Sequence, residues 1–467
     1  MQRNQSLDAL RGFAILAMVL SGSIAFGDVL PAWMYHAQVP PPKHVFIPTL
    51  PGITWVDLVF PFFLFSMGAA IPLSLSKLSK EGASFWRIVW IAARRYALLT
   101  FFALFSFHIR AWVMAEVPTT TDHLLSVFGF MLLCFQFYEY KGAQYKSLFI
   151  SLKIAAFDIA VFLLYALSFN NGEGFSLEKS DIIIIVLANM AFFGTLTWWF
   201  TKDHPYIRIG LLPFIMAIFL GAKESGSWNE AVFTFSPLPW VYKFYYLKYL
   251  FIIIPGTFAG EWLLRYSKTG IDQPPHIPTN NLIRTAAILS IILVVGNISF
   301  LFSRALLPNL ILSILLLTGI YYFIKKAHMQ KGSPLLNFFY AGAYLLLLGL
   351  FFEAYEGGIK KDISTYSYYF VSAGLAFFML ISFCGLQLSK SGAYLTHYLS
   401  LNGRNPMVAY VAGNLLLIPV LKITGGMQLL DSLSSNVWTG CLRGVLFTGI
   451  VSLITVLFVQ KKWFWKT

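Results

Sequence analysis

Two histidines and an aspartate in one short stretch are residue types that can carry acid–base chemistry. His36 and His44 lie in YHAQVPPPKHVFIPTLPG, and Asp57 follows in ITWVDLVFPFFLF. A neutral imidazole accepts a proton near neutral pH and its cation returns it. A carboxylate beside the imidazole orients it and stabilises its protonated form. The stretch predicts a catalytic histidine, His36 or His44, supported by Asp57. The competing interpretation is two solvated loop histidines and an aspartate bonded to helix ends.

The remaining histidines show no metal-ligand spacing such as HxxxH. The chain also lacks GxSxG, P-loop and GxGxxG fingerprints. Metal binding, serine hydrolysis and nucleotide binding each have one of these recognisable patterns. The sequence therefore predicts no metal site and directs attention to the histidines before Asp57.

A pair of opposite charges lies near the start of the chain, in SLDALRGFAIL. Asp8 and Arg11 are spaced i,i+3, so their side chains can pair on a helix. The hydroxyl of Ser6 can accept a bond from a free amide at the helix start. The pair is interpreted as polar support for the helix start or as part of a functional site.

The elements that must position these residues are membrane-spanning helices. Of 467 residues, 58% are hydrophobic and only 12% are charged, whereas soluble domains have about 25% charged residues. Continuous apolar runs of about 18 residues or more recur along the chain, each long enough to cross a hydrocarbon core of about 30 Å. Because the runs do not alternate, they exclude a transmembrane barrel. The predicted spans lie near 8–28, 53–75, 93–113, 120–138, 148–168, 181–200, 206–222, 245–264, 282–302, 306–324, 335–354, 365–386, 405–422 and 439–459.

This pattern predicts an all-α polytopic membrane protein with about 11–14 transmembrane helices in one bundle. The range reflects the short runs 206–222 and 405–422, which can be re-entrant or merged with a neighbour. No Pro/Gly/Ser-rich linker or charge block divides the chain. Residues 1–467 are therefore predicted to form a single membrane domain.

The net charge of +14 is spread in short clusters between apolar runs, and no long basic tract or nucleic-acid-binding motif occurs. Nucleic acid is therefore not an expected partner, whereas the lipid bilayer is. Cytoplasmic connections carry the excess of Lys and Arg. Most basic residues fall in alternate connections if both termini are cytoplasmic, and the first of these connections holds Lys77, Lys80, Arg87, Arg94 and Arg95. Residues 29–52, with both histidines, then form a loop on the outer side of a bacterial-type inner membrane.

Further polar residues stand where spans meet the membrane surface. Lys361, in KKDISTYS, is expected on the outer side. In LNGRNPMVAY, Asn405 and Pro406 follow Arg404 and mark a broken helix start. Broken helices expose backbone groups that can hold a ligand. Helix-end punctuation is the alternative interpretation of each.

The two N-terminal motifs resemble a known family. LDALRGFAILAMVL, a histidine-bearing loop and GITWVDLVFPFFLFSMGAAIPLSL are similar to the transmembrane acyltransferases related to lysosomal heparan-α-glucosaminide N-acetyltransferase, especially to bacterial members with a DUF5009-type domain. The resemblance returns in FIIIPGTFAGEWLL, KKDISTYSYYFVSAGLAFFMLISF, LNGRNPMVAYV and KKWFWK. It thus touches both ends and the middle of the chain, and the N-terminal motifs are its specific part.

The resemblance implies transfer of an acetyl group from cytosolic acetyl-CoA to an amino sugar or glycan on the outer side. The family's active histidine precedes an (A/V)DLVFP motif in an HAxW-like segment. His36 and Ala37 match the start of that segment, and the resemblance makes His36 the acetyl carrier or the general base. No Trp follows, and the loop before Asp57 is longer than in the family pattern. His44 therefore stays an alternative.

The same resemblance suggests roles for the other polar residues. Arg94, Arg95 and Arg404 would meet the phosphates of acetyl-CoA, since guanidinium forks suit phosphate. Ordinary positive-inside charge explains these arginines equally simply. Asn405 or Lys361 would donate a hydrogen bond to the thioester oxygen as negative charge develops there.

Two other functions fit parts of the sequence. An amino-sugar or small-solute transporter without acyl transfer would use the broken helices as a substrate path. A non-catalytic scaffold explains the aromatic content but not the clustered polar motifs. A histidine with a supporting acid on the outer side distinguishes the acyltransferase, because transport does not need that pair. A homodimer is implied only by the resemblance.

Overall fold

A computed structural model describes residues 4–140, 142–169, 172–268, 277–327 and 334–467. In these ranges the chain is almost entirely helical, and its extended pairs are isolated bridges such as Tyr138 with Trp465. The described residues include 12 helices that are long and apolar enough to cross a membrane. The protein is thus a polytopic helical membrane protein, and the predicted fold class is confirmed.

The predicted spans correspond to helices in the structure. Their bounds are α1 (Gln5–Ser21), α2 (Trp55–Lys80), α3 (Phe85–His108), α5 (Thr120–Phe137), α6 (Lys146–Ala166), α7 (Ile182–Thr201), α8 (Pro205–Gly221), α10 (Leu250–Lys268), α11 (Ile277–Phe302), α12 (Leu306–Lys326), α13 (Pro334–Tyr355), α14 (Tyr366–Leu386), α16 with α17 (Pro406–Ala412 and Ile418–Ile423) and α19 (Val437–Gln460). A π-turn over Gly413–Leu417 joins α16 to α17. Short helices α4 (Ala111–Met114), α9 (Trp228–Thr234) and α18 (Gly426–Ser432) and the turn η3 (Phe244–Tyr249) lie in the connections.

Two sequence predictions about the connections were wrong. The first expected connection is shorter than predicted: Lys77 and Lys80 lie in the last turn of α2, and Arg87, Arg94 and Arg95 lie in α3. Helix α3 begins at Phe85, where Ser84 caps it by accepting a bond from the Arg87 amide. Long arginine side chains let a helix extend past the apolar layer while the charge reaches water. The connection expected near 387–404 instead contains α15 (Lys390–Gly403), whose mixed polar and apolar sequence hid it from a search for apolar runs.

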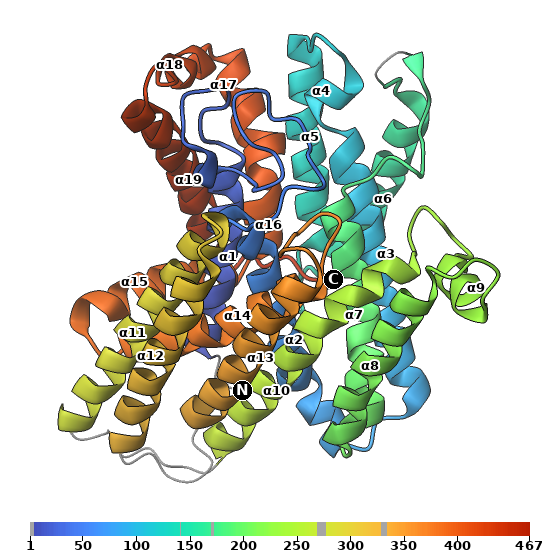
Figure 1. Cartoon of the computed structure of the whole chain (residues 1–467). Helices are drawn as coiled ribbons and strands as arrows, with labels where there is room; N and C mark the ends of the chain where they lie inside the picture. Colours follow the sequence, from blue (N-terminus) through green and yellow to red (C-terminus); the bar gives the residue numbers. More distant parts are fainter. Residues whose placement is uncertain (1–3, 141, 170–171, 269–276, 328–333) are drawn as a thin grey trace.

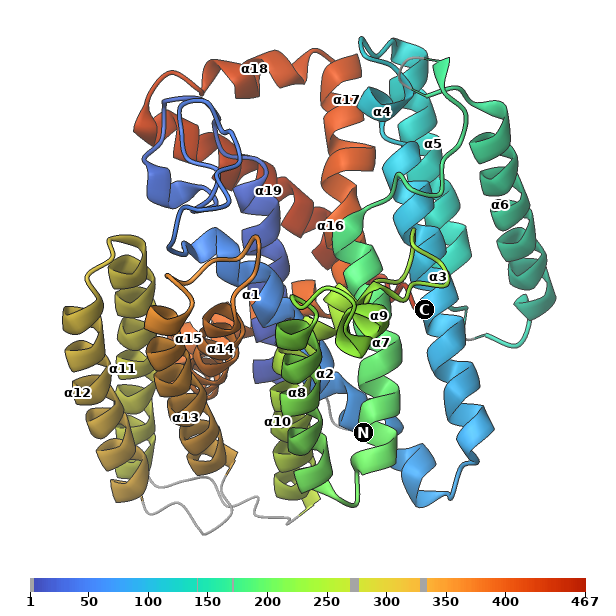
Figure 2. The ribbon, with the colours of Figure 1, turned by 45° about the vertical axis from the view of Figure 1, so that its right-hand side comes forward.

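The spans run up and down through the bundle (Figures 1 and 2). We call the side where α1 ends and α2 begins the loop side, because residues 22–54 cover it, and the side of the α2–α3 turn the turn side. Helices α2, α10 and α14 pack against one another at the centre, and α14 is buried along nearly its whole length. The loop-side ends of α2 and α14 are therefore held by the best-packed part of the fold.

Glycines let the central helices approach closely. A Cβ added at Gly12 of α1 would lie 1.8 Å from the backbone oxygen of Leu399 in α15, and one at Gly403 would lie 1.9 Å from that of Asp8. Small residues at such crossings allow backbones to touch and gain van der Waals contact, which drives helix association in a bilayer. The crossing fixes α1, and with it the start of the loop that carries His36.

We predict that Gly12→Leu pushes α1 away from α15 and lowers the free energy of unfolding by about 3 kcal/mol, the upper part of the range for overpacked cores. Thermal unfolding of the purified protein in detergent measures the effect. Gly210→Leu in α8 is the matched control, because a Cβ there meets nothing within 4 Å. Equal unfolding midpoints for the two variants would contradict the crossing described above.

Candidate active site

His36 and Asp57 form a hydrogen-bonded pair on the loop side of the bundle. The Nδ1 atom of His36 lies 2.7 Å from Oδ1 of Asp57. Asp57 is completely buried in the first turn of α2, whereas the His36 side chain is 39% exposed. The pair therefore joins a carboxylate shielded from water to an imidazole that an external molecule can reach.

A third group, the ammonium of Lys361, lies 3.2 Å from the same Nδ1 atom. If Nδ1 were unprotonated, its lone pair could accept a hydrogen bond from the ammonium. Nδ1 and Oδ1 of Asp57 would then be two acceptors 2.7 Å apart, and they would repel each other. The short distance therefore assigns the proton to Nδ1, which donates to Asp57. The lone pair then sits on Nε2, which has no hydrogen-bond partner among the described residues. Lys361 stays beside the pair as a positive charge.

The local sequence explains why Asp57 faces the histidine. Thr54 and Asp57 form a capping box at the start of α2, in which Oδ2 of Asp57 accepts the Thr54 amide at 2.9 Å. The Ala37 amide donates to the same oxygen at 3.2 Å. Oδ2 thus accepts the amide of Thr54 at the helix start and the amide of Ala37 in the loop. Oδ1 is left for His36. The structure thus shows the helix-end bonding that the alternative interpretation of Asp57 expected.

Pro61 releases a further group for this site. Proline has no N–H, so the carbonyl of Asp57, four residues earlier, loses its helical partner. The hydroxyl of Tyr368 in α14 donates to that carbonyl at 2.8 Å. This hydrogen bond joins the loop-side ends of α2 and α14 at Asp57, the partner of His36.

His44 lies elsewhere in the loop. Its Nε2 is 3.0 Å from both the amide and the carbonyl of Gly27, and its ring packs edge-on against Phe26 and Tyr35. Burial raises the pKa of Tyr35, whose hydroxyl donates to the Ala25 carbonyl at 2.6 Å. His44 thus closes the loop onto the end of α1, and the partner of Asp57 is His36.

Lys361 is carried by residues 357–365, which we call the Lys361 segment. Glu356 accepts the amides of Tyr366 and Ser367, both at 2.7 Å, and so fixes the junction with α14. The Ile359 carbonyl accepts the Gly52 amide at 2.7 Å, which joins the segment to the histidine-bearing loop. Two stretches more than 300 residues apart are thereby held side by side.

The turn η3 and the start of α14 hold the segment through Ser364. Lys248 donates to the Ser364 carbonyl at 3.0 Å, and Tyr245 and Tyr369 both lie 2.8 Å from the Ser364 hydroxyl. Sequence reasoning missed this group. Lys248 in YYLKYL was a usable signal, since an ionisable residue at the edge of a span tends to be functional.

The expected cofactor-binding residues lie toward the turn side. Arg94 is exposed on α3, and Arg95 is half-buried one residue later. Arg404 ends α15, and its buried Nε has no hydrogen-bond partner in the described part of the chain. Asn405 differs from its expected role: it is fully buried and holds the C-terminal segment, donating to the Trp463 carbonyl at 2.9 Å and accepting the Trp465 amide at 3.2 Å.

Asp8 and Arg11 provide the polar support expected of them. They pair at 3.4 Å, and Arg11 also donates to the backbone oxygens of Ser66, at 3.1 Å, and Gly403, at 3.4 Å. The guanidinium thus links α1 to α2 and α15. The cap of α1 is Asn4 and not Ser6, because Asn4 accepts the Leu7 amide at 2.9 Å.

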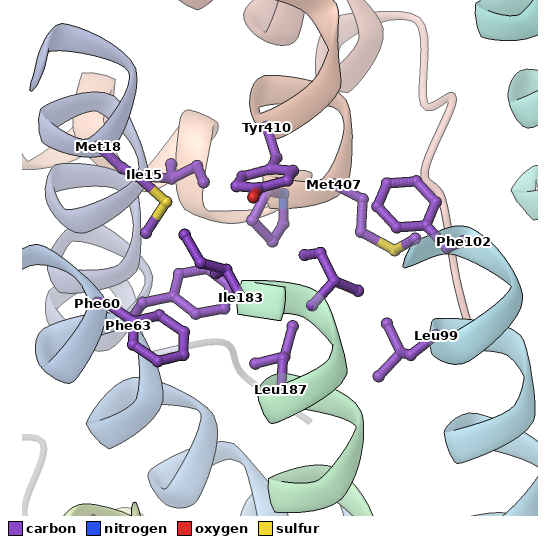
Figure 3. A pocket seen from close by; sticks show the side chains of 12 residues that line it. Ile15, Met18, Phe60, Phe63, Leu99, Phe102, Ile183, Leu187, Met407 and Tyr410 are labelled. Carbon is purple, nitrogen blue, oxygen red and sulfur yellow. The ribbon is translucent and has the colours of Figure 1, made fainter. Parts of the chain in front are cut away.

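An apolar cavity lies among α1, α2, α3, α7 and α16 (Figure 3). It measures about 30 Å³. Leu99 lines it one turn after Arg95, Pro406 lines it two residues after Arg404, and Phe60 lines it three residues after Asp57. Neither arginine nor Asp57 lines the cavity itself.

Comparison with known families identifies the N-terminal part of the chain. The domain of unknown function DUF5009 matches residues 3–263, more than half of the sequence. The chain belongs to this family. The DUF5009 match contains His36, Asp57, Arg95 and the supporting Lys248, whereas Lys361 lies beyond it. No curated protein matches the chain.

The contacts of Asp57 generate a prediction about the loop. We expect Asp57→Ala to lower the free energy of unfolding by about 3 kcal/mol, because it leaves buried amides without an acceptor. Deuterium uptake by residues 29–52 should rise at the same time. Asp122→Ala is the matched control, since Asp122 forms an exposed capping box at the start of α5. It should cost about 1 kcal/mol, and similar losses in both variants would argue against a special role for Asp57.

Proposed function

We propose that this DUF5009 protein is a membrane acyltransferase. In this proposal an acetyl group passes from cytosolic acetyl-CoA to an amine or hydroxyl of a sugar or glycan on the loop side. The observation that carries the proposal is the His36–Asp57 pair, in which a buried carboxylate holds Nδ1 of a partly exposed imidazole. The match of His36, Ala37 and DLVFP to the motifs of the lysosomal N-acetyltransferase relatives also supports it.

The pair suits direct transfer to an amine. Nε2 of His36 takes a proton from the acceptor nitrogen as that nitrogen attacks the thioester carbonyl carbon. The C–S bond then breaks, and the coenzyme A thiolate takes the proton from the imidazolium, leaving an amide and free thiol. Asp57 stabilises the imidazolium in between. The same Nε2 could instead attack the thioester itself and carry the acetyl group to the acceptor.

Lys361 has a separate role in the proposal. Its ammonium lies 3.2 Å from the unreactive edge of the His36 ring, so it is available to the negative charge that develops on the thioester oxygen. A fixed positive charge at that position lowers the free energy of the transition state, because no solvent has to reorganise around the developing negative charge. The bonds that hold the Lys361 segment to Gly52 and Ser364 keep this charge in place.

The donor has matching features on the turn side. The unpartnered Nε of Arg404 and the half-buried Arg95 suit phosphate oxygens. The apolar cavity is lined by Leu99 and Pro406, close in the chain to these arginines, and by Phe60, about one turn after Asp57. At about 30 Å³ it holds a water molecule and no more. A pantetheine arm would therefore pass only by displacing the flexible side chains of Met18 and Met407, which line the cavity.

Charge distribution supports the proposed orientation. Lys77 and Lys80 end α2 on the turn side, and Lys325 and Lys326 end α12 there. Basic residues favour the cytoplasmic side. We therefore place the turn side and both termini in the cytoplasm of a bacterial-type inner membrane, with His36 on the outer side.

We predict that His36→Gln lowers the rate of acetyl transfer by about 10²–10⁴-fold, the contribution of a general acid–base residue. The assay mixes purified protein with radiolabelled acetyl-CoA and a panel of amino sugars, and follows labelled product and free thiol. His44→Gln is the control and should retain transfer. Label that stays on wild-type protein after an acid quench, and is absent in His36→Gln, would identify the carrier route.

The opposite result has a definite form. If the wild-type protein releases no thiol with any acceptor, but takes up labelled sugar into proteoliposomes without acetyl-CoA, it is a transporter and the proposal fails. If only His44→Gln abolishes transfer, the acyltransferase stands but the active histidine is assigned wrongly.

We predict that Arg404→Ala and Arg95→Ala raise the KM for acetyl-CoA about tenfold each, through loss of a charge-assisted hydrogen bond. Because the arginines lie away from His36, kcat should change little. Arg87→Ala, an exposed arginine of the same helix α3, is the control. With acetyl-pantetheine, which has no phosphates, the wild type and both variants should have the same KM. A fall in kcat at constant KM would exclude phosphate binding at these residues.

A further inference from the structure

A second, polar cavity lies on the loop side, apart from the His36 pair. It measures about 190 Å³ and is lined by side chains from α1, α7, the π-turn, α19 and the connection after α3. We call it the polar chamber and define it by Gly22, Arg110, Asp181, Tyr410, Asn414 and Phe447. It shares Met18, Ile183 and Tyr410 with the apolar cavity, and Figure 3 shows all three around that cavity. Its volume corresponds to about six water molecules.

An ion pair forms one wall of the chamber. Nη2 of Arg110 lies 2.6 Å from Oδ2 of Asp181, and the Tyr410 hydroxyl lies 2.8 and 2.9 Å from the two carboxylate oxygens. Since the charges compensate each other, the wall is electrically neutral. It nevertheless presents N–H donors and carboxylate acceptors to whatever enters.

Asn414, unlike the paired Arg110 and Asp181, lines the chamber with a side chain that has no hydrogen-bond partner among the described residues. Within the described residues its amide makes no hydrogen bond, whereas the buried asparagines Asn189, Asn297 and Asn309 each donate at least one. The Asn414 side chain is half-buried and lines the chamber. Asn414 sits in the π-turn Gly413–Leu417, and such turns occur often at functional sites. Its amide is therefore free to donate to and accept from a ligand in the chamber.

The chemistry of the lining indicates the class of ligand. A neutral wall does not favour a free anion or cation, whereas an amide, a guanidinium and a carboxylate together suit groups that both donate and accept. Hydroxyls do both. The rings of Phe447 and Tyr410 add apolar surface that a C–H face can cover. We propose that the polar chamber binds a polyhydroxylated molecule about the size of one sugar residue. The identification of this ligand as the acceptor of acyl transfer rests on the proposed function. The prediction that the chamber binds the ligand does not depend on that function.

Calorimetric titration of the purified protein with glucose and with glucosamine tests the proposal. Asn414→Leu should weaken binding of both sugars about tenfold, the equivalent of one or two hydrogen bonds. Cyclohexanol, a ring of similar size with one hydroxyl, should not bind measurably. Thermal unfolding of the same samples reports whether each variant is folded.

Filling the chamber provides a second variant that removes no polar group. A Cβ at Gly22 would be 3.8 Å or more from its neighbours, so Gly22→Leu adds an apolar side chain to the chamber lining without a clash. It should abolish sugar binding. Gly449→Leu, where a Cβ meets nothing within 4 Å, is the matched control and should bind as the wild type does.

The outcomes separate this inference from the proposed function. Sugar binding by the wild type and by His36→Gln, lost in Asn414→Leu and Gly22→Leu, supports the chamber even if no acetyl transfer is detected. Acetyl transfer with unchanged sugar binding in both chamber variants overturns the chamber and leaves the acyltransferase intact. Failure of the wild type to bind either sugar, or binding of cyclohexanol as tight as that of glucose, also overturns the chamber.

Discussion

The burial of the Asp57 carboxylate at the start of α2 is the constraint on which the candidate active site depends. A completely buried charge is tolerated only when hydrogen bonds and opposite charges surround it. Here those bonds come from the start of its own helix, from Ala37 and from His36. The requirements of one side chain therefore fix the helix start, the loop and the orientation of the imidazole together.

The same carboxylate connects distant parts of the chain. Its backbone oxygen is released by Pro61 and taken by Tyr368, and Lys361 lies beside its histidine partner. Helix α14 is the most completely buried span, so these contacts attach an exposed loop to the most rigid part of the bundle. The partly exposed imidazole of His36 gains a fixed position in this way.

The two cavities divide the bundle by polarity. The apolar cavity is lined by Leu99 and Pro406, which follow Arg95 and Arg404 in the chain, and the polar chamber contains Arg110, Asp181 and Asn414. Tyr410 belongs to both, with its ring in the apolar cavity and its hydroxyl on the Asp181 carboxylate. Such an arrangement suits a reaction in which an acyl arm and a hydroxylated molecule approach from opposite sides of a membrane.

Sequence alone was enough for the membrane class, the approximate spans and the pairing of Asp8 with Arg11, because hydropathy and i,i+3 spacing are local properties. It also singled out Asp57 near the start of a predicted span. It could not choose between His36 and His44, because only the folded loop turns one imidazole toward Asp57 and packs the other against Gly27. The placement of Lys361, Lys248 and Tyr368, the structural use of Asn405 and the existence of the polar chamber likewise depended on tertiary structure. Each arises from contacts between helices far apart in the chain, for which a single sequence carries no periodic signal.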